Sequence, residues 1–295
     1  MGSGELAALA AALTWAIGSL LFARIGRTVP PGAMNLGKLV AAGGLLALTH
    51  LLISSKAFVP AGVPSSALML LALSGIAGLT IGDTAYFGAI VALGVPRAIL
   101  LLSSAPVFAA VFGWVWLGER LDLRAVSGIA LTLSGIGLVV LRPRVLDERV
   151  SSRGLALGVV AALGQASGSV LSRRAMQAGL DPLAAAVGRI AVGGIGLYAI
   201  AWMTGHARGW HKALAKDRAW LWVTLASLVG TYCGIWLAQT ALARASSTGV
   251  ASTLLATSPV FALPLAHVVG AEKMTARSLV GVLVAMVGIA LLTLR

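Results

Sequence analysis

The chain carries an internal repeat that spans most of its length. The segment Ala-Pro-Val-Phe-Ala at 105–109 returns as Ser-Pro-Val-Phe-Ala at 258–262, half a chain later. Further matches keep the same offset: the acid–base pairs Glu119-Arg120 and Glu272-Lys273, and the glycines Gly128, Gly135, Gly281 and Gly288. A proline, an acid and two glycines in register indicate a duplication, which restricts the fold to one built from two similar halves.

The repeat extends toward both ends of the chain, with small shifts in offset that loop insertions explain. The corresponding pairs are Gly18-Ser19 with Gly168-Ser169, Gly37-Lys38 with Gly188-Arg189, and Gly78-x-x-x-Gly82 with Gly230-x-x-x-Gly234. We therefore divide the chain into a first unit at 4–141, a polar connecting loop at 142–153 and a second unit at 154–294.

The composition is that of a membrane protein. Hydrophobic residues make up 59% of the 295 residues and charged residues only 11%, whereas soluble domains carry roughly 25% charged residues. The net charge of +13 could suggest a nucleic-acid partner. The bases fall singly or in pairs between apolar runs, however, as expected of loops beside anionic headgroups. The lone Cys233 excludes an intramolecular disulfide, and no Cys/His spacing suits a metal, so we expect neither metal nor cofactor.

Ten stretches are long and apolar enough to cross a bilayer as helices, which takes about 20 residues each. They lie at 5–23, 33–53, 66–88, 95–116, 124–141, 154–172, 182–204, 219–240, 246–268 and 276–294. The sequence predicts an all-α integral membrane protein with ten transmembrane helices, five in each unit. Since five is odd, the second unit enters the membrane in the opposite sense. Such inverted repeats build secondary transporters with a central substrate cavity near the bilayer midplane.

Three ionisable side chains lie well inside the predicted spans, where charge is costly and points to function. Lys38 and Arg189 occupy corresponding positions of the two units, and Asp83 lies on the third span. The two cations could attract a carboxylate or phosphate of a substrate, or backbone carbonyls could neutralise them structurally. Asp83 could couple protons or bind an ammonium group, or a neighbouring threonine or Lys38 could satisfy it.

Aromatic and amide side chains supply further candidates for substrate binding. Tyr86 lies nearly one turn after Asp83, so the two share a helix face. Trp15 and Gln165 correspond in the two units, each shortly before a Gly-Ser pair, and could wall the cavity from opposite sides. Plain packing is the alternative for Trp15.

The eighth span carries a polar and aromatic stripe formed by Tyr232, Trp236 and Gln239, which are spaced i, i+4 and i+7. A stripe of this kind is more often packing than ligand contact. In a bundle made mainly of Ala, Leu, Gly and Val it is still a candidate for substrate binding.

Two prolines fall inside the fourth and ninth predicted spans. Pro106 and Pro259 each free a backbone carbonyl and bend the helix, which predicts either a hinge for gating or a static bend. The pairs Ser103-Ser104 and Thr257-Ser258 lie close by and could bond the freed backbone or a substrate.

The Pro-Val-Phe segments and Gly118-Glu119-Arg120, followed by a glycine-spaced helix, resemble the EamA-type repeat of the drug/metabolite transporter superfamily. The match is good from Pro106 to Gly137 and looser in the second unit, where Ala271-Glu272-Lys273 stands for Gly-Glu-Arg. The resemblance spans the full chain. It implies a bacterial inner-membrane carrier that works by alternating access and exports amino acids, other metabolites or drugs. The chain is most similar to the amino-acid exporters, including the YddG type that moves aromatic amino acids.

The resemblance also implies both termini in the cytoplasm, whereas the basic loop residues favour both termini outside by the positive-inside rule. We expect a monomer in the lipid bilayer that binds a small-molecule substrate and no nucleic acid.

Two other classes of function fit less well. An intramembrane protease needs a serine–histidine pair at depth, but Ser167 lacks the expected spacing, and His50 and His267 lie near helix ends. A channel needs a filter loop or a charged ring, and neither is obvious. The sequence therefore predicts a transporter and not an enzyme.

Overall fold

The computed structural model describes residues 2–54, 58, 62–117, 122–140, 151–176, 178–244, 254–271 and 273–293. Regular structure within these ranges is helical throughout, with no strand. The first half of the chain forms α1 (Ser3–Ile25), α2 (Pro31–Ile53), α3 (Ser65–Ser74), η1 (Gly75–Gly82), α4 (Asp83–Leu93), α5 (Val95–Leu102), α6 (Ala105–Leu117) and α7 (Leu123–Val140). The second half forms α8 (Ser152–Met176), α9 (Pro182–Met203), α10 (Ala207–Ala215), η2 (Lys216–Arg218), α11 (Ala219–Ser227), η3 (Leu228–Cys233), α12 (Gly234–Arg244), α14 (Ser258–Val268) and α15 (Ala276–Thr293).

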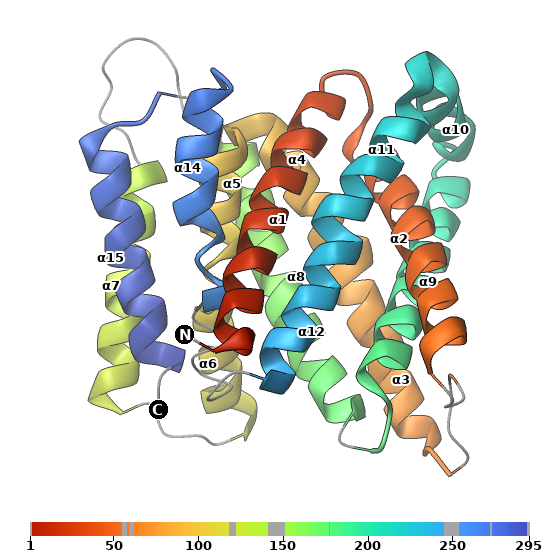
Figure 1. Ribbon diagram of the computed structural model, residues 1–295, viewed down its shortest axis with the longest axis horizontal. Coiled ribbons are helices and arrows are strands. Elements are labelled where there is room, and N and C mark those ends of the chain that lie inside the picture. Colours follow the sequence, from red (N-terminus) through yellow and green to blue (C-terminus); the bar gives the residue numbers. More distant parts are fainter. Residues whose placement is uncertain are drawn as a thin grey trace.

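Six helical segments in the described ranges are long and apolar enough to cross a membrane. They are Ser3–Ile25, Pro31–Ile53, Ser65–Leu93, Ser152–Met176, Leu183–Met203 and Ala207–Ala238. Shorter apolar helices lie at Val95–Ala109, Val126–Val139, Ser258–Val268 and Ala276–Leu291. The predicted all-α membrane protein is therefore confirmed at the level of helices without strands. Most of its helices stand roughly parallel to one another in a bundle (Figure 1).

The sequence did not predict α10, which lies between the seventh and eighth predicted spans. Ala207 and Leu214 are buried, while Arg208 and Lys212 are exposed. Trp210 packs against Gly32 at the start of α2. An amphipathic helix with this division of faces suits the boundary between lipid and water. It lies at the opposite end of the bundle from the start of α1 and the end of α15 (Figure 1).

The two prolines lie in the first turn of a helix and not in the middle of a continuous helix, which corrects the prediction of bent spans at 95–116 and 246–268. Pro106 is the second residue of α6, after a turn at 103–104 that separates it from α5. Pro259 is the second residue of α14, after a turn at 256–257. Proline is well tolerated there because an N–H in the first helical turn has no intrahelical acceptor. Residues 246–253 of the ninth predicted span lie outside the described ranges.

Two π-helical segments interrupt the third and eighth predicted spans at corresponding positions. The segment η1 contains the motif Gly78-x-x-x-Gly82, and η3 contains Gly230, the counterpart of Gly78. Short π-helical insertions are rare and are often found at functional sites. Both halves of the chain therefore contain a π-helical segment at the corresponding position. The sequence did not predict either segment.

A buried asparagine stabilises the first π-helical segment. Asn35 of α2 is fully buried and donates from Nδ2 to the Leu79 carbonyl at 2.7 Å and to Thr84 Oγ1 at 2.8 Å. Thr80 Oγ1 donates to the Gly193 carbonyl of α9 at 2.7 Å. These bonds hold η1 between the second and seventh predicted spans.

The two halves of the chain pack against each other through corresponding contacts. The segment η1 lies on α8 and α9, while η3 lies on α1 and α2. Gly78 meets Gly168 in the first contact, and Gly230 meets Gly18 in the second. At the edge of the bundle α7 runs beside α15 (Figure 1), and these two helices meet at Gly135 and Gly281.

Candidate functional site

A central cavity of about 570 Å³ lies where helices from both halves converge. Its lining draws on α1, α2, η1, α4, α5, α6, α8, α9, η3, α12 and the turn before α14. Seven of the side chains predicted to act in transport line it: Trp15, Lys38, Asp83, Tyr86, Ser103, Pro106 and Gln165. The structure thus brings together residues that lie on five different helices and on the turn that follows α5.

An ion pair between Lys38 Nζ and Asp83 Oδ2 stands on one wall of the cavity. The lysine side chain is 7% exposed and the aspartate side chain 19% exposed. Lys38 Nζ also lies 5.4 Å from the centre of the Phe87 ring. The sequence left open whether a threonine or Lys38 satisfies Asp83, and the structure pairs it with Lys38. The part of the Asp83 carboxylate that stays exposed faces the cavity.

Arg189 lines the same cavity but has no acid of its own. It is the counterpart of Lys38, whereas the position that corresponds to Asp83 holds Ile235. Its Nε atom is buried and has no hydrogen-bond partner in the part of the chain that the structure describes. Among the lining residues two cations therefore share one carboxylate, which leaves the cavity with an excess of positive charge.

Aromatic side chains gather on the wall that α1 and α4 contribute. Trp15, Phe22, Tyr86 and Phe87 all line the cavity, and the rings of Phe22 and Phe87 lie 4.6 Å apart between centroids. The Tyr86 hydroxyl and Ser19 Oγ are hydrogen-bonded at 2.8 Å, so this polar tip is held in place. The wall offers a flat apolar surface beside the charged one.

Several predicted residues lie elsewhere. Trp236 is 40% exposed on the outside of α12 and is not part of the cavity lining. The Tyr232 hydroxyl hydrogen-bonds Thr49 Oγ1 at 2.9 Å, and its ring packs with the cluster between α2 and α9. Gln239 is on α12, but its side chain lies outside the described part of the structure.

Of the predicted residues on the ninth span, Ser258 lines the cavity, whereas Thr257 and Pro259 do not. Thr257 Oγ1 donates to the Leu254 carbonyl at 2.6 Å, and Pro259 is buried. Neither lines the cavity, whereas Ala256 and Ser258 do. The prediction was thus close in sequence, but the turn at 256–257 changes which side chain points inward.

Sequence reasoning missed several lining residues as site candidates. Ser19 and Ser169 belong to the repeated motifs, so repetition itself was the available signal. Phe22 and Phe87 carried no signal, because an isolated phenylalanine in an apolar span reads as lipid contact or packing. Within the described residues, no three His, Cys, Asp or Glu side chains cluster as metal ligands.

Comparisons with known proteins agree with this architecture. The model of the EamA-like transporter family matches residues 2–141 and again 152–294. One solved crystal structure is similar over 99% of this chain and 96% of its own, with 20% sequence identity and a TM-score of 0.63, which supports the fold alone. A search of curated proteins finds no match. Since the family model covers both halves of the chain, the protein belongs to the EamA-like transporter family, whose members are multi-pass membrane transporters of small molecules.

Proposed function

We propose that this protein is a secondary transporter that exports amino acids by alternating access, with the substrate carboxylate bound at Arg189. The observation that carries the proposal is the buried Nε atom of Arg189 beside the central cavity, which has no hydrogen-bond partner among the residues that the structure describes. A buried cation is costly unless it meets an anion. Arginine also binds carboxylates in a bidentate geometry that adds both energy and orientation.

The rest of the lining suits the other parts of an amino acid. Asp83 keeps part of its carboxylate exposed to the cavity and can accept a hydrogen bond from an α-ammonium group. The rings of Trp15, Phe22 and Phe87 provide a surface for an apolar or aromatic side chain. A cationic drug fits less well, because the lining already carries excess positive charge.

The proposed architecture is ten transmembrane helices in two inverted units, at 4–141 and 154–294, joined by the loop at 142–153. The crosswise packing supports it, because η1 lies on α8 and α9 as η3 lies on α1 and α2. The two matched ranges of the family model also support the division. Two halves that meet around one cavity can rock against each other, which is the usual basis of alternating access.

The breaks before α6 and α14 are the proposed gates. Ser103 and Pro106 border the cavity at one break, and Ala256 and Ser258 border it at the other. At the first break, α5 and α6 can change their mutual angle without breaking the hydrogen-bond ladder of a continuous helix, and the turn before α14 can act as the second gate. We place the protein in the bacterial inner membrane and expect it to act as a monomer.

The test is counterflow in proteoliposomes, with the twenty amino acids screened against one labelled substrate. Saturable exchange of amino acids is expected. Arg189→Gln should raise the KM about tenfold to a hundredfold, the effect of losing a charged hydrogen bond. The control variant is Arg153→Gln, which removes an exposed arginine at the start of α8 and should leave the KM unchanged.

Two results would contradict the proposal. Passive, non-saturable flux would indicate a channel. An Arg189→Gln protein with an unaltered KM, or equal affinity for an amino acid and its amide, would show that Arg189 does not bind the carboxylate.

A further inference from the structure

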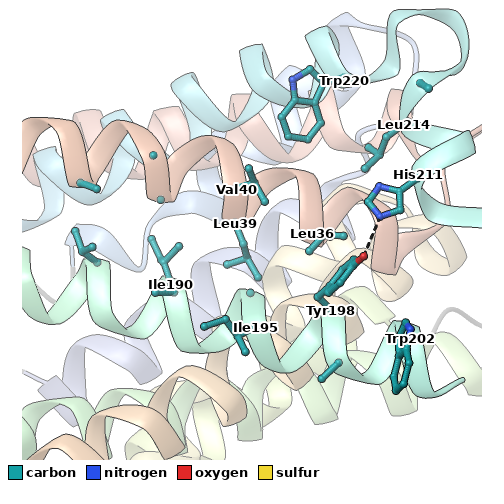
Figure 2. A pocket seen from close by; sticks show the side chains of 18 residues that line it. Leu36, Leu39, Val40, Ile190, Ile195, Tyr198, Trp202, His211, Leu214 and Trp220 are labelled. Atoms are coloured by element: carbon teal, nitrogen blue, oxygen red, sulfur yellow. Dashed lines mark hydrogen bonds between the residues drawn. The ribbon is translucent and has the colours of Figure 1, made fainter. Parts of the chain in front are cut away.

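A second cavity, of about 1220 Å³, opens on the outside of the bundle between α2 and α9 (Figure 2). Its walls are apolar, and several lining side chains are exposed: Val40 by 54%, Ile195 by 71% and Trp202 by 74%. Gly44 and Gly194 line the cavity without a side chain and so leave space in it. A Cβ added to Gly44 would meet no atom within 4 Å. We call this cavity the lateral groove.

The length of the lateral groove matches one leaflet of a membrane. Along α2 the lining runs from Leu36 to Ala47, and along α9 it runs from Val187 to Trp202. At 1.5 Å per residue the α2 wall is about 16 Å long. The α9 wall is about 22 Å long by the same measure. The hydrocarbon core of a bilayer is about 30 Å thick, so a groove that begins at one interface reaches the midplane or slightly beyond it.

One end of the groove has the composition of a membrane interface. Trp202 and Trp220 stand at this end with Tyr198 and His211 between them (Figure 2). The Tyr198 hydroxyl and His211 Nε2 lie 3.4 Å apart. Tryptophan, tyrosine and histidine gather where lipid headgroups meet the acyl chains, and this end of the groove therefore lies at headgroup depth.

Positive charge surrounds the same end. Arg208, Lys212, Lys216 and Arg218 are all exposed on α10 and η2, and Asp217 is the one acid in the described segment 207–218. Basic residues at a membrane surface attract anionic lipids by about 1 kcal/mol each. The lateral groove is thus apolar along its length and has a cluster of basic residues at its interfacial end.

We propose that the lateral groove binds one anionic glycerophospholipid, with an acyl chain between α2 and α9 and its phosphate at α10. Arg208 lies one turn before His211 and two turns before Ala215, and both of these residues line the groove. Arg208 therefore shares the groove-facing side of α10. Lys212 follows Arg208 by one turn and completes the phosphate site.

The bound lipid would touch the back of the substrate cavity. Leu39 and Ile190 line both the lateral groove and the central cavity, so these two side chains form a shared wall. A lipid in the groove would stabilise the present spacing of α2 and α9. The lipid site itself depends only on the membrane location and not on which substrate the central cavity carries.

The test is native mass spectrometry of the full chain in detergent, titrated with phosphatidylglycerol or with phosphatidylcholine of the same acyl chains. One phosphatidylglycerol should be retained at concentrations at least about tenfold below phosphatidylcholine. The double variant Arg208→Gln/Lys212→Gln should weaken phosphatidylglycerol binding about fivefold per charge. The double variant Arg153→Gln/Arg174→Gln removes two exposed bases of α8 and should change nothing.

A second variant tests the acyl-chain slot. Gly44→Leu places its Cβ where no atom lies within 4 Å and projects a side chain into the groove. It should abolish retention of the single lipid, while thermal unfolding shows that the protein remains folded. Ala130→Leu, on the exposed side of α7, is the matched control. Equal retention of the two lipids by the unaltered protein would overturn the proposal, as would full retention in Gly44→Leu. So would dimers that Gly44→Leu abolishes, because a second copy would then occupy the groove.

Discussion

Gly18 of α1 and Gly230 of η3 lie against each other with their backbones in contact. A Cβ added to Gly230 would lie 2.8 Å from the Cα of Gly18, closer than such atoms can approach. The counterpart contact joins Gly78 of η1 to Gly168 of α8. Close approach of small residues is a main source of helix association in lipid, where burial of apolar surface between helices gives little.

The first prediction concerns this contact. Gly230→Ala should destabilise the protein by about 1–3 kcal/mol, because the added methyl group forces α1 and η3 apart. Gly44→Ala is the matched variant, since its Cβ meets nothing, and it should stabilise α2 by about 0.5–1 kcal/mol through helix propensity. Thermal or denaturant unfolding in detergent measures both. If the two variants shift stability in the same direction, the backbone contact between Gly18 and Gly230 does not determine the stability change of Gly230→Ala.

The second prediction concerns the π-helical segment η1. Asn35→Leu removes the donor to the Leu79 carbonyl and Thr84 Oγ1, and the carbonyl is then buried without that partner. The expected loss of stability is about 1–3 kcal/mol. The control is Ser127→Ala, which removes an exposed hydroxyl bonded to its own helix and should stay within about 0.5 kcal/mol. An Asn35→Leu protein as stable as the unaltered one would mean that water or a relaxed backbone satisfies the carbonyl.

The candidate site shows how far sequence reasoning reaches. Lys38, Asp83 and Arg189 were identified because charge inside an apolar span is costly, and all three line one cavity. A different signal, the correspondence between the two halves of the internal repeat, predicted Trp15 and Gln165 as cavity residues. Their mutual arrangement needed the structure. The sequence offers Lys38 as one of several possible partners of Asp83, and it does not show that Arg189 Nε has no hydrogen-bond partner among the described residues.

What sequence could not predict has a physical cause in each case. The lipid around a membrane protein is as apolar as the interior of the protein. The pattern of apolar residues therefore does not reveal which face of α12 points inward. Trp236 was therefore chosen although it faces outward. The π-helical segments differ from α-helix by a local change in hydrogen bonding, which leaves hydropathy unchanged. The short α10 falls below the length at which periodicity distinguishes a helix from a polar loop.

The third prediction concerns proton coupling. If Asp83 exchanges protons during transport, Asp83→Asn should abolish uptake driven by a pH gradient in proteoliposomes but retain counterflow, because an amide cannot take up a proton. The variant leaves Lys38 without its carboxylate partner, so the double variant Lys38→Met/Asp83→Asn controls for the unpaired charge. Gradient-driven uptake that survives in Asp83→Asn would show that Asp83 does not couple protons to transport.

The last prediction separates the two tryptophans chosen from the sequence. Trp15 lines the cavity, whereas Trp236 is 40% exposed on the outside of the bundle. Trp15→Phe should raise the KM for an aromatic amino acid, since the smaller ring buries less substrate surface. Its loss of contact is worth about 1 kcal/mol, or about fivefold in KM. Trp236→Phe should leave the KM unchanged, because its ring faces lipid.

Counterflow titrations on both proteins measure the difference, with thermal unfolding to show that each is folded. Trp15 also packs against Gly234 of α12, so part of its effect could come through helix packing. A packing effect would change the KM for aliphatic and aromatic substrates alike, whereas a direct contact changes mainly the aromatic ones. A larger effect at Trp236 than at Trp15 would place the substrate on the outer face of α12 and remove the central cavity as the binding site.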